Sequence, residues 1–486
     1  MDALYPKGDF RGSAAAVLSV ILVMGLGGAA PFAYMTDPWD RTYDGDGPAP
    51  TELAWFPAAS MIFPRSSPQA AELPDGDVLV IGGISTGGPT RTTEVYDPEG
   101  DSWRPGPSMN VARVGHTATL LSDGTVLVTG GETGSGATAS AELLDIGSGS
   151  SLLVGEMSFA RSGHAAALLG DGRVLVTGGT DWMTGVWKYA EAYDPASHSF
   201  VPAGTMAYAR MLLTLQPLQD GRVLAIGGDS EGTSEVYDPG SGSWGSVAFM
   251  SSKRYSASSV ALADGQVLVA GGSSGTAVLS SAEVYGPGPG VWVPVEGMSA
   301  PRASFGLELT PGGRVVATGS WSALGTSGSV ESLCPCEFTW RAEDPMSVAR
   351  GMHGSAVTSN GTVLAIGGWD GSRPLSSVEM LVEVRSEEPP EPGGCEPMDL
   401  LPLVRAVADE LRGHSENGLI AKLFVAQAAY DLGRTELCLD VLDAFYRQVR
   451  AFSQSGHLCD ASTSMLYDGY AELVGCLGGE PLPPIP

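Results

Sequence analysis

The chain has 486 residues, with 55 Asp and Glu against 26 Lys and Arg, so its formal net charge is −29 at pH 7 and its pI is about 4.4. Charge of this sign repels nucleic-acid phosphates and argues against DNA or RNA as a partner. It suits an exported protein with an acidic, soluble surface, without identifying a ligand.

The first feature along the chain is an uncharged segment over residues 12–36, which Lys7 and Arg11 precede and acidic residues follow. Its length is sufficient to span a bilayer, which takes about 20 residues. Basic residues before the segment place the rest of the chain outside the cell. A cleavable signal peptide is the alternative, because small residues at 28–30 offer a cleavage site. The protein is therefore expected to be membrane-anchored with its N-terminus inside, or secreted.

From residue 52 onward the chain repeats a Met followed four residues later by an Arg. The seven pairs are Met61/Arg65, Met109/Arg113, Met157/Arg161, Met206/Arg210, Met250/Arg254, Met298/Arg302 and Met346/Arg350. Successive methionines are 48, 48, 49, 44, 48 and 48 residues apart. A fixed period of this size indicates units that bury their apolar faces only by stacking on one another.

Each unit reads as four β-strands. Two apolar runs joined by Asp-Gly, as at Asp171-Gly172, predict a hairpin with a type I′ turn. A glycine pair such as Gly178-Gly179 follows, then a third strand of the form Glu191-Ala-Tyr-Asp-Pro, then a fourth strand that begins at an aromatic residue. Four strands repeated radially predict a seven-bladed all-β propeller.

The ends of the array predict how the ring closes. The last unit stops near Val384 without an aromatic fourth strand, whereas Trp55 holds that position ahead of the first Met. We therefore expect the strand at Trp55 to complete blade seven, which removes two exposed sheet edges.

These landmarks in register resemble the kelch repeat over residues 52–384, and the Asp-Gly-Arg-Val-Leu-Val form is similar to the galactose oxidase group of kelch propellers. Membership in that group would imply a copper radical site with a Tyr–Cys cross-link. The propeller's cysteines, Cys334 and Cys336, lie on the third-strand side of blade six, so we expect no copper, no other metal and no cofactor. Cys-Pro-Cys is interpreted as a local thiol pair or disulfide.

Beyond the propeller the sequence predicts further segments: an acidic, Pro-rich linker at 385–398, a helical bundle at 399–478 and a Pro-rich tail at 479–486, matching a linker at 37–51 before the first strand. The helical part resembles the FIMAH domain, which implies a surface or assembly role and no catalytic residues. Antiparallel helices would bring Cys438 and Cys476 to one end of this bundle, so a disulfide between them is expected, with Cys395 as the competitor for Cys438.

Two sets of charged and polar residues are candidates for chemistry. The seven arginines, among them Arg113, Arg161 and Arg350, would form a cationic rim for carboxylate or sulfate groups. Seven glutamates at one repeat position favour buried structural ion pairs instead. Three histidines lie three residues after an arginine: His116, His164 and His353. Strand alternation places them opposite the arginine, which favours packing over metal binding.

The loops after the glycine pairs carry the candidate ligand-binding residues. They are Trp182, Trp187 and Tyr189 in blade three, Trp321 in blade six, and Trp369 and Arg373 in blade seven. Exposed Trp and Arg are enriched at binding hot spots, although Trp also packs over blade ends. The predicted function is extracytoplasmic binding of a protein or glycan at this aromatic end. A carbohydrate oxidase or sugar isomerase and a purely structural cell-surface part are the alternatives, and no catalytic residue is identified.

Overall fold

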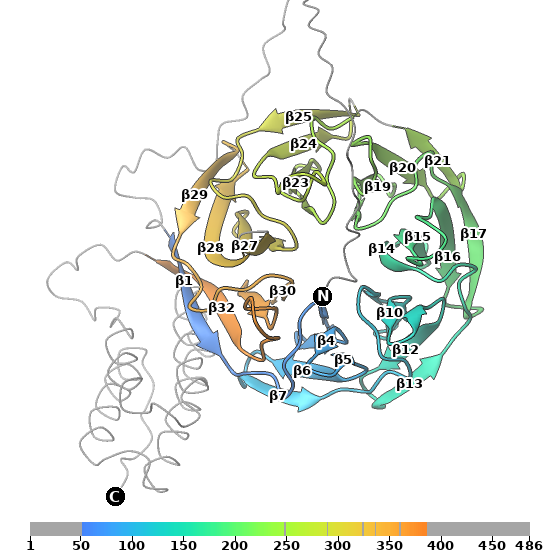
Figure 1. The fold of residues 1–486 in the computed structure, drawn as a ribbon, viewed down its shortest axis with the longest axis horizontal. Helices are drawn as coiled ribbons and strands as arrows, with labels where there is room; N and C mark the ends of the chain where they lie inside the picture. Colours follow the sequence, from blue (N-terminus) through green and yellow to red (C-terminus); the bar gives the residue numbers. More distant parts are fainter. Residues whose placement is uncertain are drawn as a thin grey trace, which may run out of the picture. The chain divides into compact units, whose positions relative to one another are not determined.

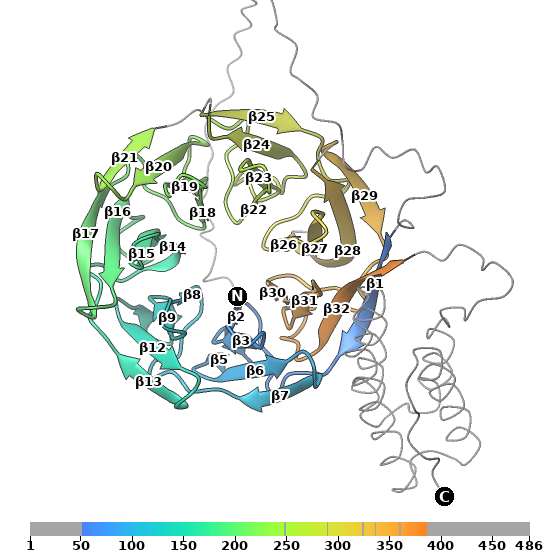
Figure 2. The same ribbon diagram turned by 180° about the vertical axis from the view of Figure 1, so that it is seen from behind.

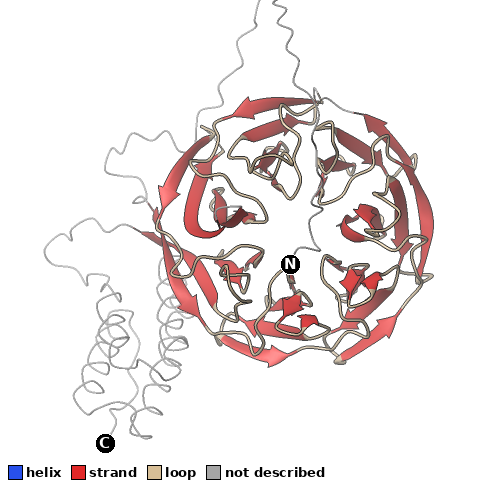
Figure 3. Ribbon diagram, viewed as in Figure 1, coloured by secondary structure: helices blue, strands red, loops and turns tan. Residues whose placement is uncertain are grey.

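The structure is a computed structural model that describes residues 51–385 except 247–248, 289, 323–324, 336 and 359–360. In this part of the chain every regular element is a β-strand (Figure 3). Seven four-stranded sheets stand around a common axis as the blades of a propeller (Figures 1 and 2). The predicted all-β seven-bladed fold is confirmed.

Several predicted segments lie outside the described residues. They are the anchor or signal segment at 1–36, the linker at 37–51 up to residue 50, the acidic linker beyond residue 385, the helical domain at 399–478 and the tail at 479–486, together with Cys395, Cys438 and Cys476. Over 51–385, with the gaps given above, no helix is long and apolar enough to cross a membrane.

Each blade places one strand in each of four layers, counted outward from the axis. The innermost strands are β2 (Gln69–Glu72), β8 (Thr117–Leu120), β14 (Ser162–Leu168), β18 (Thr214–Pro217), β22 (Ser258–Ala261), β26 (Gly306–Leu309) and β30 (Gly354–Val357). The second strands are β3 (Val78–Ile81), β9 (Val126–Thr129), β15 (Val174–Thr180), β19 (Val223–Ile226), β23 (Val267–Ala270), β27 (Val315–Ser322) and β31 (Val363–Ile366).

The third strands are β6 (Thr93–Asp97), β12 (Ala141–Asp145), β16 (Tyr189–Asp194), β20 (Ser234–Asp238), β24 (Ala282–Gly286), β28 (Gly325–Cys334) and β32 (Val378–Arg385). The outermost strands are β7 (Ser102–Pro105), β13 (Ser150–Leu153), β17 (Ser199–Thr205), β21 (Ser243–Ser246), β25 (Val291–Val295), β29 (Thr339–Glu343) and β1 (Thr51–Ala58). Two small hairpins, β4 (Ile84–Ser85) with β5 (Gly88–Pro89) and β10 (Glu132–Thr133) with β11 (Gly136–Ala137), extend the loops after the second strands of blades 1 and 2.

Blade 7 is closed as the sequence predicts. Strand β1 pairs antiparallel with β32 along its whole length, and Trp55 lies opposite Leu381. In blade 1 the corresponding register places Trp103 opposite Tyr96. The N-terminal strand therefore supplies the aromatic position that the last repeat lacks, and the pairing extends from Thr51 to Arg385, one residue beyond each predicted end of the propeller.

The hydrophobic core lies between the blades. In β3, Val78 and Val80 pack against Leu364 and Ile366 of blade 7, as one cluster. The alternate residues of β3 belong to a second cluster, shared with blade 2. Each blade is thus apolar on both faces. Because a buried Val or Leu contributes roughly 1.5–3 kcal/mol, a blade gains most of its stability only when it is stacked between neighbours.

The hairpin turns differ from the prediction in one detail. In blade 1 the amide of Gly76 donates to the carbonyl of Leu73 at 2.9 Å, and Gly76 has φ 90°. Asp75 does not share the left-handed conformation; its Oδ1 instead accepts the amide of Asp77 at 3.2 Å. The turn is therefore a type I turn followed by one left-handed glycine, and not the predicted type I′ turn, which requires two such residues.

Loop length explains the short spacing in the repeat. The connection between the second and third strands covers 227–233 in blade 4, whereas it covers 271–281 in blade 5. Blade 4 is therefore four residues shorter, which accounts for the spacing of 44 between Met206 and Met250.

Candidate functional site at the loop face

One face of the propeller carries both the loops that join the second and third strands and the segments that join consecutive blades. In blade 1 these two kinds of connection are hydrogen-bonded to each other, from the amide of Ser66 to the carbonyl of Ile84 at 2.9 Å. We call this side the loop face. All sequence-predicted ligand-binding residues belong to it.

The seven repeated arginines are buried at this face, each against the glutamate of its own blade. The N–O distances are 2.5 Å for Arg65–Glu94, 2.7 Å for Arg113–Glu142, 3.6 Å for Arg161–Glu191, 2.8 Å for Arg210–Glu235, 3.0 Å for Arg254–Glu283, 2.8 Å for Arg302–Glu331 and 2.7 Å for Arg350–Glu379. Each arginine side chain is at most 1% exposed. Such a charge is stable when buried only because it is paired.

Each arginine also joins two blades. In blade 2, Nη1 of Arg113 donates to the carbonyl of Gly130 in its own blade at 2.6 Å. The backbone carbonyl of Arg113 accepts the amide of Gly83 in blade 1 at 3.0 Å. It lies so close that a Cβ on Gly82 would meet it at 2.8 Å. The glycine pair is therefore required for the close approach of the next blade.

Arg113, Arg161 and Arg350 are consequently enclosed by protein. Burial lowers the pKa of Arg113 and of Arg350, and the paired glutamate opposes that change. The geometry is that of the structural ion pairs that the equal number of glutamates favours. A rim of free guanidinium groups is not present on the described part of the chain.

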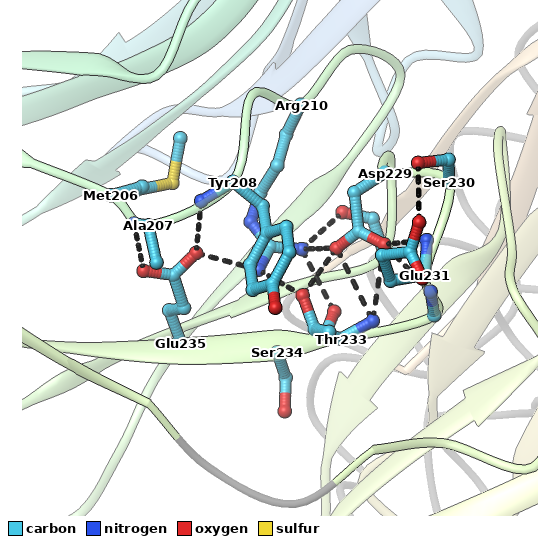
Figure 4. Close-up of polar contacts among 12 residues, drawn as sticks. Met206, Ala207, Tyr208, Arg210, Asp229, Ser230, Glu231, Thr233, Ser234 and Glu235 are labelled. Atoms are coloured by element: carbon cyan, nitrogen blue, oxygen red, sulfur yellow. Dashed lines mark hydrogen bonds and ion pairs between the residues drawn. The ribbon is translucent and has the colours of Figure 1, made fainter.

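In blade 4 a second carboxylate joins the pair (Figure 4). Arg210 contacts Asp229 at 2.5 Å and Glu235 at 2.8 Å. Asp229 also accepts the amides of Gly232 at 2.6 Å and of Glu231 at 2.8 Å. This aspartate holds the shortened loop in place of the longer connection of the other blades. Its lone pairs are taken up by the loop itself, so it offers no site for a ligand.

Blade 3 departs from the framework in the opposite direction. Arg161 is 3.6 Å from Glu191, and a register irregularity lies between Tyr189 and Glu191. Nη1 of Arg161 donates to the carbonyl of Tyr189 at 3.1 Å, whereas Nε and Nη2 make no hydrogen bond. Burial lowers the pKa of Arg161 to about 10, which Glu191 only partly opposes. The ion pair is weakest in the blade that carries the most aromatic loop.

The blade 3 loop, residues 181–188, supports an aromatic cluster of Phe159, Trp187 and Tyr189. Phe159 and Tyr189 are stacked, with ring centroids 4.9 Å apart and an interplanar angle of 9°. Trp187 lies 4.9 Å from Phe159, and its Nε1 donates to the carbonyl of Ala160 at 2.9 Å. Sequence reasoning missed Phe159, which the segment between blades 2 and 3 brings to the cluster. Its position two residues after the repeated Met157 is the sequence signal that could have identified Phe159.

Trp182 lies in the same loop but outside the cluster. Its φ is 62°, a value that bulky residues rarely adopt. Among the described residues, the other non-glycine residues with positive φ all occupy two repeated positions, two residues after the arginine or in the turn before the outer strand. Burial raises the pKa of Glu132 in the blade 2 hairpin, and the neighbouring Trp182 indole opposes this rise. Trp182 is thus a strained residue that no repeat requirement explains.

Trp321, Trp369 and Arg373 are on blades 6 and 7, which two other blades separate from blade 3 in either direction around the ring (Figure 1). Both tryptophans are half-buried. Arg373 is exposed, with its Nε 3.5 Å from Asp370. The structure therefore does not join these candidates to the blade 3 cluster.

The three histidines are enclosed between blades. Nε2 of His164 lies 3.0 Å from Oγ1 of Thr129 in blade 2, and Nε2 of His353 lies 3.0 Å from Oγ1 of Thr318 in blade 6. Burial lowers the pKa of His116 and of His353 to about 3, and nearby arginines add to the effect. All three imidazoles are neutral at neutral pH and pack between blades, as strand alternation predicts.

A further titratable group was not anticipated. Glu308 on the innermost strand β26 accepts a hydrogen bond at 2.5 Å from Oγ of Ser355 on β30 of the next blade. Burial raises the pKa of this carboxyl, and the Ser355 hydroxyl opposes the rise. Carboxyls with a raised pKa are the kind that catalytic sites use, although structural sites also contain them.

Comparison with known proteins agrees with the fold. A model of the Kelch motif matches residues 65–110 and 350–382, which lie mainly in blades 1 and 7. No curated protein matches the chain. Among solved structures, a fungal alcohol oxidase of the AA5 family, in complex with copper, is similar, with a TM-score of 0.59 and 18% sequence identity. The match covers 70% of this chain and 80% of the oxidase. The chain therefore carries Kelch motifs on a propeller of the same fold as that oxidase.

The described residues do not fit a copper centre. In that part of the chain no three His, Cys, Asp or Glu side chains are placed together to hold a metal ion. The three histidines lie in separate interfaces, since His116 packs against Gly82 of blade 1, and Cys334 is engaged in a disulfide. The likeness to the oxidase is one of fold.

Proposed function

We propose that this propeller is a binding module whose ligand, a protein or a glycan, docks on the loop face at blade 3. The observation that carries the proposal is the half-exposed aromatic cluster of Phe159, Trp187 and Tyr189. Framework aromatics such as Trp103 hold a repeated position opposite the third-strand Tyr96. Trp187 and Tyr189 instead lie where no other blade has an aromatic residue. The cluster also lies beside the Arg161–Glu191 pair, which is the widest ion pair of the ring.

The test uses the full chain on glycan and peptide arrays. Trp187→Ala and Tyr189→Ala should each abolish the binding signal while the melting temperature moves little, because both residues border a loop. Trp182→Ala reports whether binding extends over the rest of the blade 3 loop, and Trp369→Ala reports whether the separate blade 7 loop takes part. Trp103→Ala is the matched control, since it should lower the melting temperature and leave binding intact in the folded fraction. Binding that survives both cluster substitutions would refute the proposal.

We propose the location from the sequence alone: the uncharged segment at 12–36 after Lys7 and Arg11 supports an extracytoplasmic propeller, anchored with its N-terminus inside or secreted. Protease added to intact cells should digest the propeller. Protection in intact cells with digestion after lysis would exclude this location.

An enzyme acting on carbohydrates is the second candidate, favoured by the raised pKa of Glu308 on an innermost strand. If this group acts as acid or base, a sugar-modifying activity should be lost in Glu308→Gln with the fold intact. If the full chain turns over no mono- or oligosaccharide, the enzyme candidate is excluded and the binding function remains. A structural cell-surface part would show neither binding nor turnover.

A further inference from the structure

The blade 3 loop exposes mainly carbon. Met183 is 91% exposed, Tyr189 is 40% exposed and Val186 is 36% exposed. The segment that leads into blade 4 runs alongside, with the amide of Met206 donating to the carbonyl of Lys188 at 2.9 Å. That segment adds Tyr208, which is also exposed. The loop thus presents aliphatic and aromatic side chains on a protein of strongly negative net charge.

Many polar atoms of this loop already have partners within the protein. Oδ1 of Asp181 accepts the amides of Met183 at 3.0 Å and of Thr184 at 2.7 Å. Oγ1 of Thr180 donates to the carbonyl of Gly185 at 2.8 Å and accepts the amide of Trp182 at 2.9 Å. The Trp187 indole is likewise bound to a backbone carbonyl. A ligand dense in hydroxyl groups would have to leave most of them without partners here, at a cost for each group.

The aromatic faces are also partly occupied. Phe159 and Tyr189 cover one face of each other, and Trp187 is tilted by 40° to both rings. The cluster therefore offers edges and one outer face, rather than the open flat platform on which a sugar ring stacks. This geometry suits an apolar side chain, which gains free energy from carbon contact without needing hydrogen bonds.

The charge of the loop indicates which charged group the ligand carries beside its apolar side chain. Lys188 lies between Trp187 and Tyr189 in the chain, is exposed, and makes no ion pair among the described residues. Burial would raise the pKa of Asp181, but hydrogen bonds from Thr184 and the loop amides lower it to about 2, so this carboxylate is already satisfied. The loop therefore has a free cation and no free anion, on a protein of opposite overall charge.

From these contacts we infer that the ligand of blade 3 is a segment of a partner protein that presents an apolar side chain beside a carboxylate. The inference rests on the proposed binding function and chooses between its two ligand classes. The hydrogen bonds of Thr180 and Asp181 brace the loop from within, which lowers the cost of ordering it on binding.

The experiment selects random displayed peptides on the immobilised full chain. Selected peptides should be enriched in Leu, Ile, Met or Phe next to Asp or Glu. A synthetic selected peptide should bind the Met183→Asp, Val186→Asp double variant at least about tenfold more weakly, a difference of about 1.4 kcal/mol. Thr276→Asp, in the matching loop of blade 5, is the control and should bind as the unchanged chain does. Equal melting temperatures of these variants establish that the loss is local.

A charge reversal makes the test specific. Lys188→Glu should bind the selected peptide more weakly and should prefer its counterpart with Lys in place of Asp or Glu. Peptides that bind the double variant unchanged overturn the inference. Glycan binding that depends on Trp187 and Tyr189, without peptide binding, overturns the inference but retains the proposed function. Failure of both ligand classes on this face overturns both.

Discussion

Arg161 and Glu191 lie 3.6 Å apart, the widest of the seven Arg–Glu pairs, and Arg161 also has two nitrogen atoms without a hydrogen bond. The pair Arg113–Glu142 in the adjacent blade lies at 2.7 Å, and its arginine is as fully buried as Arg161. Two members of one repeat thus differ in how well a buried charge is compensated, and the difference coincides with the aromatic loop of blade 3.

This contrast predicts unequal losses of stability. Arg113→Met should lower the free energy of unfolding by ~3 kcal/mol or more, because it leaves the buried Glu142 without its partner. Arg161→Met should lower the free energy of unfolding by less, because the buried charge of Arg161 is only weakly paired with Glu191. Urea denaturation of both variants measures the difference, and equal losses would show that the wider distance has no energetic consequence.

Closure of the ring predicts an effect of truncation. A chain that begins at Met61 lacks β1, which pairs with β32 and carries Trp55 opposite Leu381. Loss of the Trp contact should cost at least ~2 kcal/mol, and the freed edge of β32 would expose unpaired amides. Its melting temperature should fall below that of a chain that begins at Pro48. Identical melting temperatures would mean that β1 adds nothing to the ring.

The buried histidines predict sensitivity to acid. The pKa of His116 and of His353 is about 3 in the fold, well below the value near 6.5 of an unfolded chain. The neutral form is favoured in the fold, so their full contribution to stability exists above pH 6.5. It is lost as the pH falls toward 3, by about 1.4 kcal/mol per pH unit for each residue.

Leu213 in blade 4 occupies the same repeat position, which makes leucine the matched replacement. His116→Leu and His353→Leu should flatten the dependence of the unfolding free energy on pH between 6.5 and 4, relative to the unchanged chain. A parallel pH profile in the double variant would assign acid sensitivity to the carboxylates instead.

The short loop of blade 4 predicts a local dependence on Asp229. Asp229→Ala removes the acceptor of the amides of Glu231 and Gly232 and one partner of Arg210. Buried donors would be left without acceptors, so the free energy of unfolding should fall by roughly 1–3 kcal/mol or more. Asp220→Ala is the control: its ion pair with Arg222 is exposed and should be worth less than about 1 kcal/mol. Equal effects of the two changes would contradict the role of Asp229.

The sequence alone determined the architecture, because the repeat is itself a physical requirement. A period near 48 residues with Met, Arg, glycine pair, Glu and aromatic in register predicts units that must stack, and the missing aromatic after Val384 predicts closure at Trp55. These features depend on local propensity and on the spacing of residues along the chain, so the sequence contains them in full. The turn type was beyond this reasoning, since Asp-Gly is compatible with both type I′ and type I turns followed by a left-handed glycine.

Only the tertiary structure decided what the candidate residues do. Whether Arg113 forms an open rim or a buried pair depends on the distance to Glu142, which lies in another strand. Phe159 joins Trp187 because the segment between blades passes over the next blade, a contact that no local pattern encodes. The strain at Trp182 and the weak Arg161–Glu191 pair also arise from chain geometry across strands. The surroundings of the candidate residues are therefore set by packing between strands and blades, whereas the ring follows from the repeat.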